Sequence, residues 1–358
     1  MTLIDKYRDT IIQNLPEWNH STAKEDLVVQ EQIQAFKNAC AQIDIINSSD
    51  DELLEKLAHI VEQYVPDNHI TIHDKDGISL RKNPFKHLSP PQNLATQDLN
   101  NKDLISVQKI TVQPNKTPWL IGTLKETNTG IIAIPSFGGD IQAQEKERKT
   151  FIKTFFKQKS LHKWEHIIFD FRGNTGGDSE LIRELAERMC NQTIRYADKS
   201  EPAEILTPCL SHSQSDIFKG HIFILQDEYN ASAAEGAVFM LSQLQNSKTI
   251  GTSTSGTFQG GACKDIQMPI GTLTIGTIYR ERFKNGKPIK EKEGIPPDIP
   301  CSSENAFNTA LMHIQEIKKK NISKELNAYC ILHQIITHTH KETKSSSLPI
   351  YKRNSAGR

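Results

Sequence analysis

The chain has 358 residues, which is enough to bury a substantial core and to form two domains or one large domain with additions. Its 43 lysines and arginines balance 43 aspartates and glutamates, so no global field would attract nucleic acid or an anionic membrane. Charges at Asp5, Lys6 and Arg8 interrupt the amino terminus, which predicts neither a signal peptide nor a membrane span. We therefore expect a cytoplasmic protein, with export by a leaderless route left open.

The cysteines and histidines do not predict a metal site. The six cysteines are scattered and form no CxxC or CxxH spacing, which favours reduced thiols over a structural zinc site or a disulfide scaffold. His73 beside His69, and the group His333, His338 and His340, raise a metal hypothesis, but the second group lies in a segment typical of a helix end. We expect no metal and no cofactor.

The first 82 residues are predicted to form a helical domain that ends in a histidine-bearing strand. Capping-box patterns begin at Thr22 and at Ser49, each ahead of apolar residues at helical spacing. The stretch DNHITIHD that follows the helices alternates as a strand does, which would place His69 and His73 on one face.

The rest of the chain divides by composition. Residues 83–104 are rich in proline, asparagine and glutamine, which predicts a linker. Within residues 105–302, hydrophobic strands such as HIIFDF and HIFILQ alternate with helical patterns, which predicts an α/β domain. Residues 303–340 are predicted to form C-terminal helices. The basic composition of residues 341–358 cannot support a packed core, so a disordered tail is expected there.

A glycine-rich turn, RGNTGGDS, follows the strand HIIFDF and opens into a helix. Its Gly176 and Gly177 would let backbone N–H groups approach a ligand, and the helix amino terminus favours negative charge. Such a turn suits an oxyanion or a phosphate, and it equally suits a structural turn that requires glycine. The Gly-Lys-Ser/Thr ending of a phosphate-binding P-loop is absent.

Ser232 lies in the next strand-to-helix unit, HIFILQDEYNASAAEG. At the first turn of a helix that leaves a sheet edge, its hydroxyl would point into a cleft where small neighbours leave room for a substrate. The same position suits a serine that only caps the helix. The serine alone therefore does not define an active site.

The segments DFRGNTGG, NASAAE, GTSTSG and EKEGIPPDI, taken in series, resemble the C-terminal processing (tail-specific) serine peptidases. The resemblance covers roughly residues 110–300 and implies a crotonase-like (ClpP/crotonase-type) α/β core beside a small N-terminal helical domain. It implies that Ser232 is the nucleophile. The N–H of Ala233, with that of Gly176 or Gly177, would then form the oxyanion hole.

One position departs from this pattern. Members with a Ser-Lys dyad carry a lysine directly after the segment that reads GTSTSG here, whereas this chain has Thr257. The chain also resembles a branch without a PDZ module, which includes tricorn core proteases and the chlamydial protease-like activity factor and uses histidine and glutamate. That resemblance implies His69 as the base and Glu291 as its partner, with Glu293 in reserve. Lys264 is the alternative base.

We therefore expect a serine endopeptidase that forms an acyl-enzyme on Ser232 and binds an extended polypeptide. The missing dyad lysine leaves open a second class, a catalytically inactive homologue that binds a peptide or a hydrophobic ligand. A crotonase-type acyl-CoA enzyme would share the core but has no use for a nucleophilic serine. Too few residues separate His69 from Ile131 to hold a PDZ module of ordinary size, so capture of carboxyl-terminal tails is not expected. Substrate identity and homo-oligomerisation stay open.

Overall fold

The computed structural model of the protein describes all residues outside positions 1, 20–25, 68, 81–103, 112–117, 139–144, 196–198, 202–204, 209–215, 258–262, 278, 285–286, 290–291 and 346–358. The chain falls into two compact units, residues 1–310 and 311–358. No helix among the described residues is both long and apolar enough to cross a bilayer. The predicted linker, residues 83–104, lies outside the described set except for its last residue.

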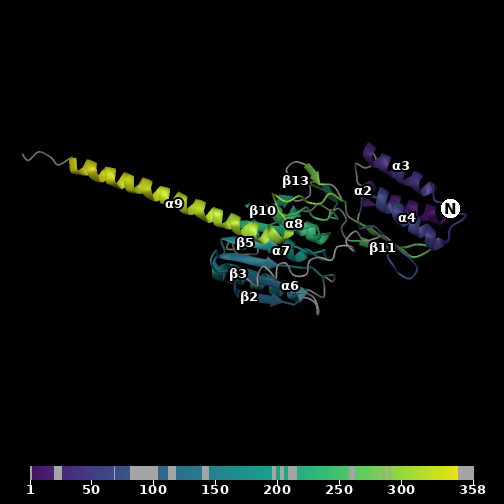
Figure 1. The fold of residues 1–358 in the computed structure, drawn as a ribbon, viewed down its shortest axis with the longest axis horizontal. Helices are drawn as coiled ribbons and strands as arrows, with labels where there is room; N and C mark the ends of the chain where they lie inside the picture. The colour runs from purple at the N-terminus through teal and green to yellow at the C-terminus, as the bar shows by residue number, and fades with distance from the viewer. Residues whose placement is uncertain are drawn as a thin grey trace, which may run out of the picture. The chain divides into compact units, whose positions relative to one another are not determined.

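The described part of the chain opens with the helices α1 (Leu3–Asn14), α2 (Pro16–Asn19), α3 (Leu27–Ala41) and α4 (Asp50–Tyr64) (Figure 1). A capping box of Ser49 with Glu52 begins α4, as the sequence pattern predicts. The capping box predicted at Thr22 lies outside the described residues, and the side chain of Asp26 caps α3.

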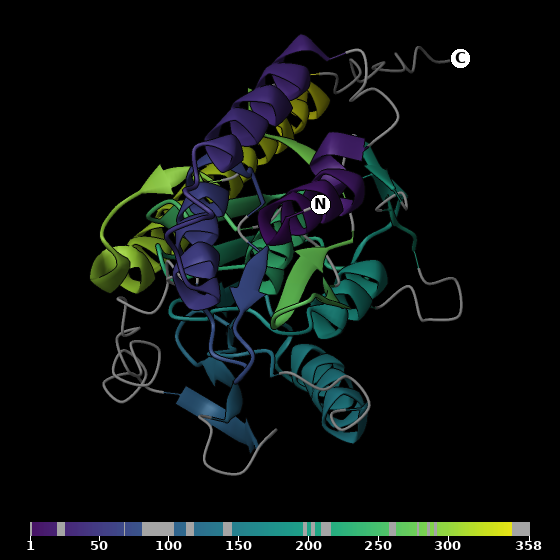
Figure 2. The ribbon, with the colours of Figure 1, turned by 90° about the vertical axis from the view of Figure 1, so that its right-hand side faces the viewer.

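A strand hairpin at residues 263–276 packs with these helices. Strand β1 (Thr71–His73) pairs with β12 (Thr272–Gly276), which pairs with β11 (Cys263–Gln267). Leu273 and Ile275 are fully buried in the same hydrophobic cluster as the N-terminal helices. Figures 1 and 2 show the hairpin in green beside the purple helices. The hairpin lies within the predicted core domain, residues 105–302, but its apolar side chains pack into the cluster of the N-terminal helices instead.

The described strands of the core form one mixed sheet in the order β15-β10-β9-β5-β4-β3-β2. Strands β4, β5, β9, β10 and β15 are parallel, while β2 and β3 are antiparallel to their neighbours. The bounds are β2 (Leu104–Ile110), β3 (Trp119–Leu124), β4 (Thr129–Ala133), β5 (His166–Asp170), β9 (His221–Gln226), β10 (Ser247–Gly251) and β15 (Ile299–Pro300). The predicted α/β fold is confirmed, and the crotonase-like assignment stays a prediction.

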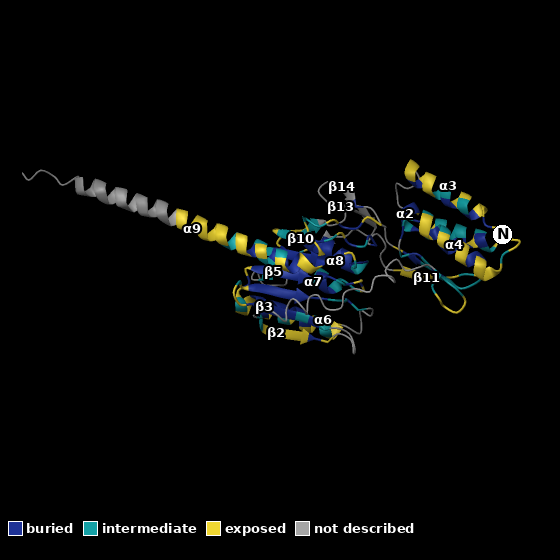
Figure 3. Ribbon diagram, viewed as in Figure 1, coloured by how far each residue is buried: buried dark blue, intermediate teal, exposed yellow. Residues whose placement is uncertain are grey.

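Helices α6 (Glu145–His162), α7 (Glu180–Met189) and α8 (Ala233–Ser242) share one buried cluster with the sheet. The strands β4 and β5 are buried along their whole length, as continuous apolar runs predict, whereas the edge strand β2 is largely exposed (Figure 3). Strands β5 and β9 run parallel, so the turns at their carboxyl ends meet at one edge of the sheet. These are the turns that carry the predicted glycines and Ser232.

The remaining described strands are short: β6 (Ile194–Arg195), β7 (Lys199–Glu201), β8 (Ile205–Leu206), β13 (Tyr279–Lys284) and β14 (Lys287–Ile289). After the 3-10 turn η2 (Ser303–Asn305), the chain forms one continuous helix, α9 (Ala306–Ser345). The sequence predicted several helices over 303–340 and a disordered tail from residue 341. Instead, the helix continues through the first residues of that predicted tail, and positions 346–358 lie outside the described residues.

Candidate active site

Ser232 lies in a strained turn between β9 and α8. Its φ of 54° and ψ of −121° fall in a region that non-glycine residues rarely adopt. The N–H of Ser232 donates to the carbonyl of Thr257 at 2.8 Å, and its own carbonyl accepts from the N–H of Gly236 at 3.1 Å. Although Ser232 occupies the N-cap position of α8, its side chain makes no capping hydrogen bond. The hydroxyl is therefore available for a role other than capping.

His69 contacts the hydroxyl of Ser232. The two residues are 163 positions apart in the sequence, yet His69 Nε2 lies 3.0 Å from Ser232 Oγ. The other ring nitrogen, Nδ1, lies 3.3 Å from Oδ1 of Asp67, whose side chain is fully buried. Because a carboxylate only accepts hydrogen bonds, we assign the proton to Nδ1, which leaves Nε2 to accept from the serine hydroxyl.

The segment that carries His69 is fixed at both ends. Asp67 follows α4, and its Oδ1 also accepts the backbone N–H of His69 at 2.7 Å. Strand β1 begins two residues later, where Thr71 lies opposite Thr274 of β12. The predicted strand over residues 67–74 is therefore shorter than expected, and His69 lies in a turn before it. His69 and His73 consequently do not share a strand face.

Gly176 lies directly against the serine turn. A Cβ atom built on Gly176 would lie 2.8 Å from the carbonyl oxygen of Ala231 and 3.1 Å from Cβ of Ser232, so only glycine fits there. The N–H of Gly176 donates to Oδ1 of Asn174 at 2.8 Å and is not available to an oxyanion. Of the predicted donors, the N–H groups of Gly177 and Ala233 are left as candidates.

A polar network that the sequence analysis missed ties the two turns together. Asn230 Nδ2 donates to the carbonyls of Phe171 at 2.5 Å and Asn174 at 3.2 Å. Asp227 accepts the N–H of Gly173 at 2.9 Å through Oδ2. Burial raises the pKa of Asp227 to about 6. The only sequence signal for these residues is their place immediately after buried strands, where polar side chains commonly bond to turn backbone.

The other candidate base does not have a suitable environment. Lys264 lies on the exposed strand β11, and its Nζ donates to Oδ1 of Asn14 at 2.8 Å. An exposed, hydrated ammonium lacks the desolvation that makes lysine a base. Thr257, at the position of the dyad lysine, is buried and binds the N–H of Ser232 through its backbone carbonyl.

The predicted acidic partners are only partly described. Glu291 lies outside the described residues, and Glu293 is exposed in the turn before Gly294. Asp67 is the carboxylate that the structure brings to His69. Glu291 therefore stays a prediction, while the geometry adds the carboxylate of Asp67, which the sequence placed only in the strand-like stretch DNHITIHD.

Among the described side chains, no group of three or more histidine, cysteine or acidic residues could hold a metal ion. The side chains of His333, His338 and His340 lie outside the described part.

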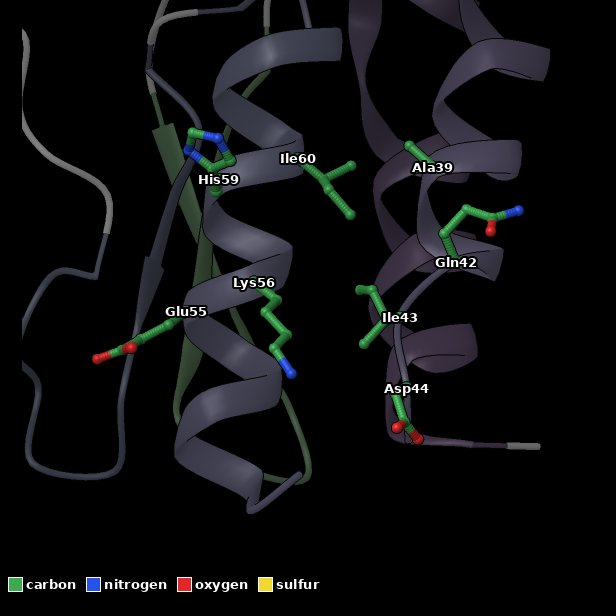
Figure 4. Close-up of a pocket in the computed structure, with 8 residues that line it drawn as sticks. All are labelled: Ala39, Gln42, Ile43, Asp44, Glu55, Lys56, His59 and Ile60. Carbon is green, nitrogen blue, oxygen red and sulfur yellow. The ribbon is translucent and has the colours of Figure 1, made fainter. Parts of the chain in front are cut away.

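A separate pocket of about 550 Å³ lies between α3 and α4 (Figure 4). It is lined by Ala39, Gln42, Ile43, Asp44, Glu55, Lys56, His59 and Ile60. None of these residues belongs to the constellation around Ser232, so this pocket is not the candidate active site.

A serine hydroxyl, an imidazole and a buried carboxylate in sequential contact form the arrangement that serine hydrolases use. Residues 128–301 match the sequence profile of peptidase family S41. The chain therefore carries a peptidase S41 domain, and the resemblance inferred from its motifs is confirmed. No curated protein sequence matches the chain.

Solved structures share the fold at low sequence identity. A candidate peptidase from Parabacteroides merdae has a TM-score of 0.61 and 14% identity, over 87% of this chain and 95% of that chain. Mature CPAF complexed with lactacystin has a TM-score of 0.52 and 12% identity, over 89% of this chain and 98% of that chain. The photosystem II D1 C-terminal processing protease is similar at a TM-score of 0.46 and 9% identity, over 84% and 92%. We draw no inference from this last likeness.

Proposed function

We propose that the protein is a serine endopeptidase that forms an acyl-enzyme on Ser232, with His69 as the general base and Asp67 as the carboxylate that orients it. The observation that carries the proposal is the 3.0 Å contact between His69 Nε2 and Ser232 Oγ. Such a contact lies within the hydrogen-bond range expected of a nucleophile and its base. Ser232 lies within the residues 128–301 that match peptidase family S41, which supports the same chemistry.

In the proposed reaction, Nε2 of His69 takes the proton of the Ser232 hydroxyl as Oγ attacks the scissile carbonyl. The imidazolium that forms faces the Asp67 carboxylate, which stabilises its charge and keeps the ring oriented. His69 then gives the proton to the leaving amine, and the acyl-enzyme remains on Oγ. Water, deprotonated by His69, attacks the ester and releases the second product and the free serine.

The oxyanion of the tetrahedral intermediate needs donors beside Oγ. Ala233 is the first residue of α8, where N–H groups lack intrahelical acceptors and the helix dipole favours negative charge. A Cβ atom on Gly176 would lie 3.3 Å from the nitrogen of Ala233, so the glycine turn borders this site. We assign the oxyanion to the N–H groups of Ala233 and Gly177. Losing one such donor typically reduces kcat about 100- to 1,000-fold.

The proposed substrate is a polypeptide in extended conformation. The interval between His69 and Ile131 leaves no room for a PDZ module of ordinary size. The substrate backbone would therefore be recognised by pairing with a strand edge near the site rather than by capture of its carboxyl terminus. Glu291 is kept as a second acidic residue of the proposed site.

The first test is intact-mass spectrometry after incubation with a fluorophosphonate, in which an activated serine displaces fluoride and retains the phosphonyl group. We expect one adduct on the parent and on Lys264→Ala, and none on Ser232→Ala or His69→Ala. An adduct on Ser232→Ala would assign the nucleophile elsewhere. A folded parent that takes no adduct would instead support the non-catalytic binding protein.

A further inference from the structure

Glu235 is a buried carboxylate that the proposed reaction does not use. It is the third residue of α8, one turn after Ser232, and it is 0% exposed. Among the described residues, four groups donate to it, and all four belong to the segment 254–257. Oε1 accepts from Gly256 N at 2.8 Å and from Thr254 Oγ1, and Oε2 accepts from Thr257 N at 2.6 Å and Ser255 Oγ at 3.2 Å.

These four donors are neutral, and no cation among the described residues pairs with the buried carboxylate. Burial raises the pKa of Glu235, and the hydrogen bonds oppose that shift. A backbone N–H on each carboxylate oxygen favours the ionised, acceptor-only form. The first turn of a helix adds a favourable dipole for the same charge. The site is therefore built to hold a carboxylate rather than an amide.

The segment 254–257 in turn holds the nucleophile. Thr257 donates its N–H to Glu235, while its carbonyl accepts the N–H of Ser232 at 2.8 Å. Two residues earlier in each segment, the N–H of Ser255 donates to the carbonyl of Asn230 at 2.9 Å. A positive φ at a serine persists only when the surroundings fix it, and these backbone contacts supply that constraint.

The same segment also holds the chain next to the predicted acidic residue Glu291. The carbonyl of Gly256 accepts the N–H of Lys292 at 2.8 Å. Oγ1 of Thr254 accepts the N–H of Ile295 at 2.7 Å. A Cβ atom on Gly256 would lie within 2.8 Å of three backbone atoms of Lys292, so the two segments are in close backbone contact.

We propose that Glu235 is a positioning residue of the active site: by holding the segment 254–257 against the serine turn, it fixes the backbone of Ser232 and so directs its hydroxyl toward His69. This proposal rests on the peptidase function proposed above. Glu235 does not touch the reacting atoms. Its effect is transmitted through the backbone of Thr257, whose N–H donates to the Glu235 carboxylate and whose carbonyl accepts the N–H of Ser232.

The test is Glu235→Gln, which keeps the shape of the side chain. Its NH2 group must face the backbone N–H of either Gly256 or Thr257, so one of these two hydrogen bonds is lost. We expect the second-order rate of fluorophosphonate labelling to fall about 10- to 100-fold, because small misplacement of a nucleophile is costly. For peptide hydrolysis, kcat should fall by a similar factor while KM changes less than about twofold.

The matched control is Asp298→Asn, which changes another carboxylate that accepts a backbone N–H and a hydroxyl, both from Thr249 at 2.9 and 3.2 Å. It should label at the parent rate. Thr254→Val, which removes one donor to Glu235 and also the acceptor of the Ile295 N–H, should slow labelling about 3- to 10-fold. Parent labelling rates in both Glu235→Gln and Thr254→Val would overturn the proposal.

Hydrogen exchange separates this proposal from the peptidase function. The amides of Ser232 and Thr257 should lose protection in Glu235→Gln but not in Asp298→Asn. If the parent takes no fluorophosphonate adduct while protection is lost as expected, the peptidase function fails and the positioning role of Glu235 stands. Unchanged protection in Glu235→Gln would overturn the positioning role whether or not the parent is labelled.

Discussion

The nucleophile and the base of the proposed site are held in different ways. Ser232 lies within the core, between a central strand and the helix that follows it, and backbone hydrogen bonds from nearby turns fix its conformation. His69 lies between a helical region and a strand of only three residues, and that strand depends on its pairing with β12. The core therefore builds the nucleophile, whereas a hairpin that extends from the core positions the base.

Polar contacts among the described residues join the N-terminal helices next to His69, here called the base side, to the hairpin and to Lys292. The hydroxyl of Tyr7 donates to the carbonyl of Ile270 in the hairpin turn. Nζ of Lys292 donates to the carbonyl of Glu62 at 2.9 Å. Nζ of Lys264 in β11 donates to Oδ1 of Asn14 in α1 at 2.8 Å. Apolar side chains such as Leu273 add to this attachment through the N-terminal cluster. Damage to the hairpin should therefore impair catalysis by displacing His69 while the turn that carries Ser232 stays intact.

The largest expected effect is the loss of either member of the Ser232–His69 pair. Ser232→Ala and His69→Ala should each lower kcat for peptide hydrolysis by about 10⁴- to 10⁶-fold, because members of a triad act as a unit. The double variant should be no worse than either single one. Additive losses would show that the two residues act independently. Circular dichroism melting should confirm that all three variants fold.

Asp67→Asn should rank next, with kcat lower by about 100- to 10,000-fold, because an amide partner favours the wrong tautomer of the His69 ring. Glu291→Gln, tested in parallel, measures the acidic residue that the resemblance implies. If Glu291→Gln costs more than Asp67→Asn, the orienting carboxylate is Glu291. Equal, small losses would place the orienting group elsewhere.

The sequence predicts the position of Ser232 far better than the position of His69. Continuous apolar runs identify β4, β5 and β9, and short turns place Gly176 and Ser232 at one sheet edge. Local patterns suffice because each of these elements is followed directly by the residues that it positions. The contact with His69 spans 163 residues, and only the family resemblance suggested it.

Two features had no local signal. The hairpin of β11 and β12 alternates like any surface strand pair, and the pattern does not reveal which hydrophobic cluster it joins. The side chain of Asn174 accepts the N–H of Gly176, and this hydrogen bond forms only in the folded turn. From the sequence alone, Gly176 and Gly177 were therefore equally suited to donate to an oxyanion. Long-range pairing and side-chain bonds to turn backbone are set by the tertiary structure rather than by propensity.

Leu273→Ala should damage the base side selectively. The fully buried side chain lies opposite Ile72 of β1, and its truncation should cost about 2–5 kcal/mol of unfolding free energy. Leu185→Ala, in the buried face of α7, should cost a similar amount in the other cluster. Among folded molecules, only Leu273→Ala should label more slowly with fluorophosphonate, by about tenfold. Equal labelling of the two variants would contradict the proposed dependence on the hairpin.

The smallest expected effect is the pH dependence of stability that Asp227, beside the turns around Ser232, confers. Its pKa in the folded protein is raised from 3.8 to about 6, so the folded state binds the proton more tightly than the unfolded chain does. Stability from this group is therefore complete below pH 4 and is lost as the pH rises through 6, by about 3 kcal/mol as an upper estimate. Asp227→Asn, which resembles the protonated form, should remove this loss.

Urea unfolding of the parent and Asp227→Asn at pH 4, 5, 6 and 7 measures the effect as a difference between the two proteins. The stability of the variant relative to the parent should rise over this range, chiefly between pH 4 and 6. A constant difference would show that Asp227 has the same proton affinity in both states. Because Asp227 accepts the N–H of Gly173, a rise would show that the turns around Ser232 keep a buried negative charge at a cost in stability. No comparable cost is expected from Leu273, whose contribution should be independent of pH.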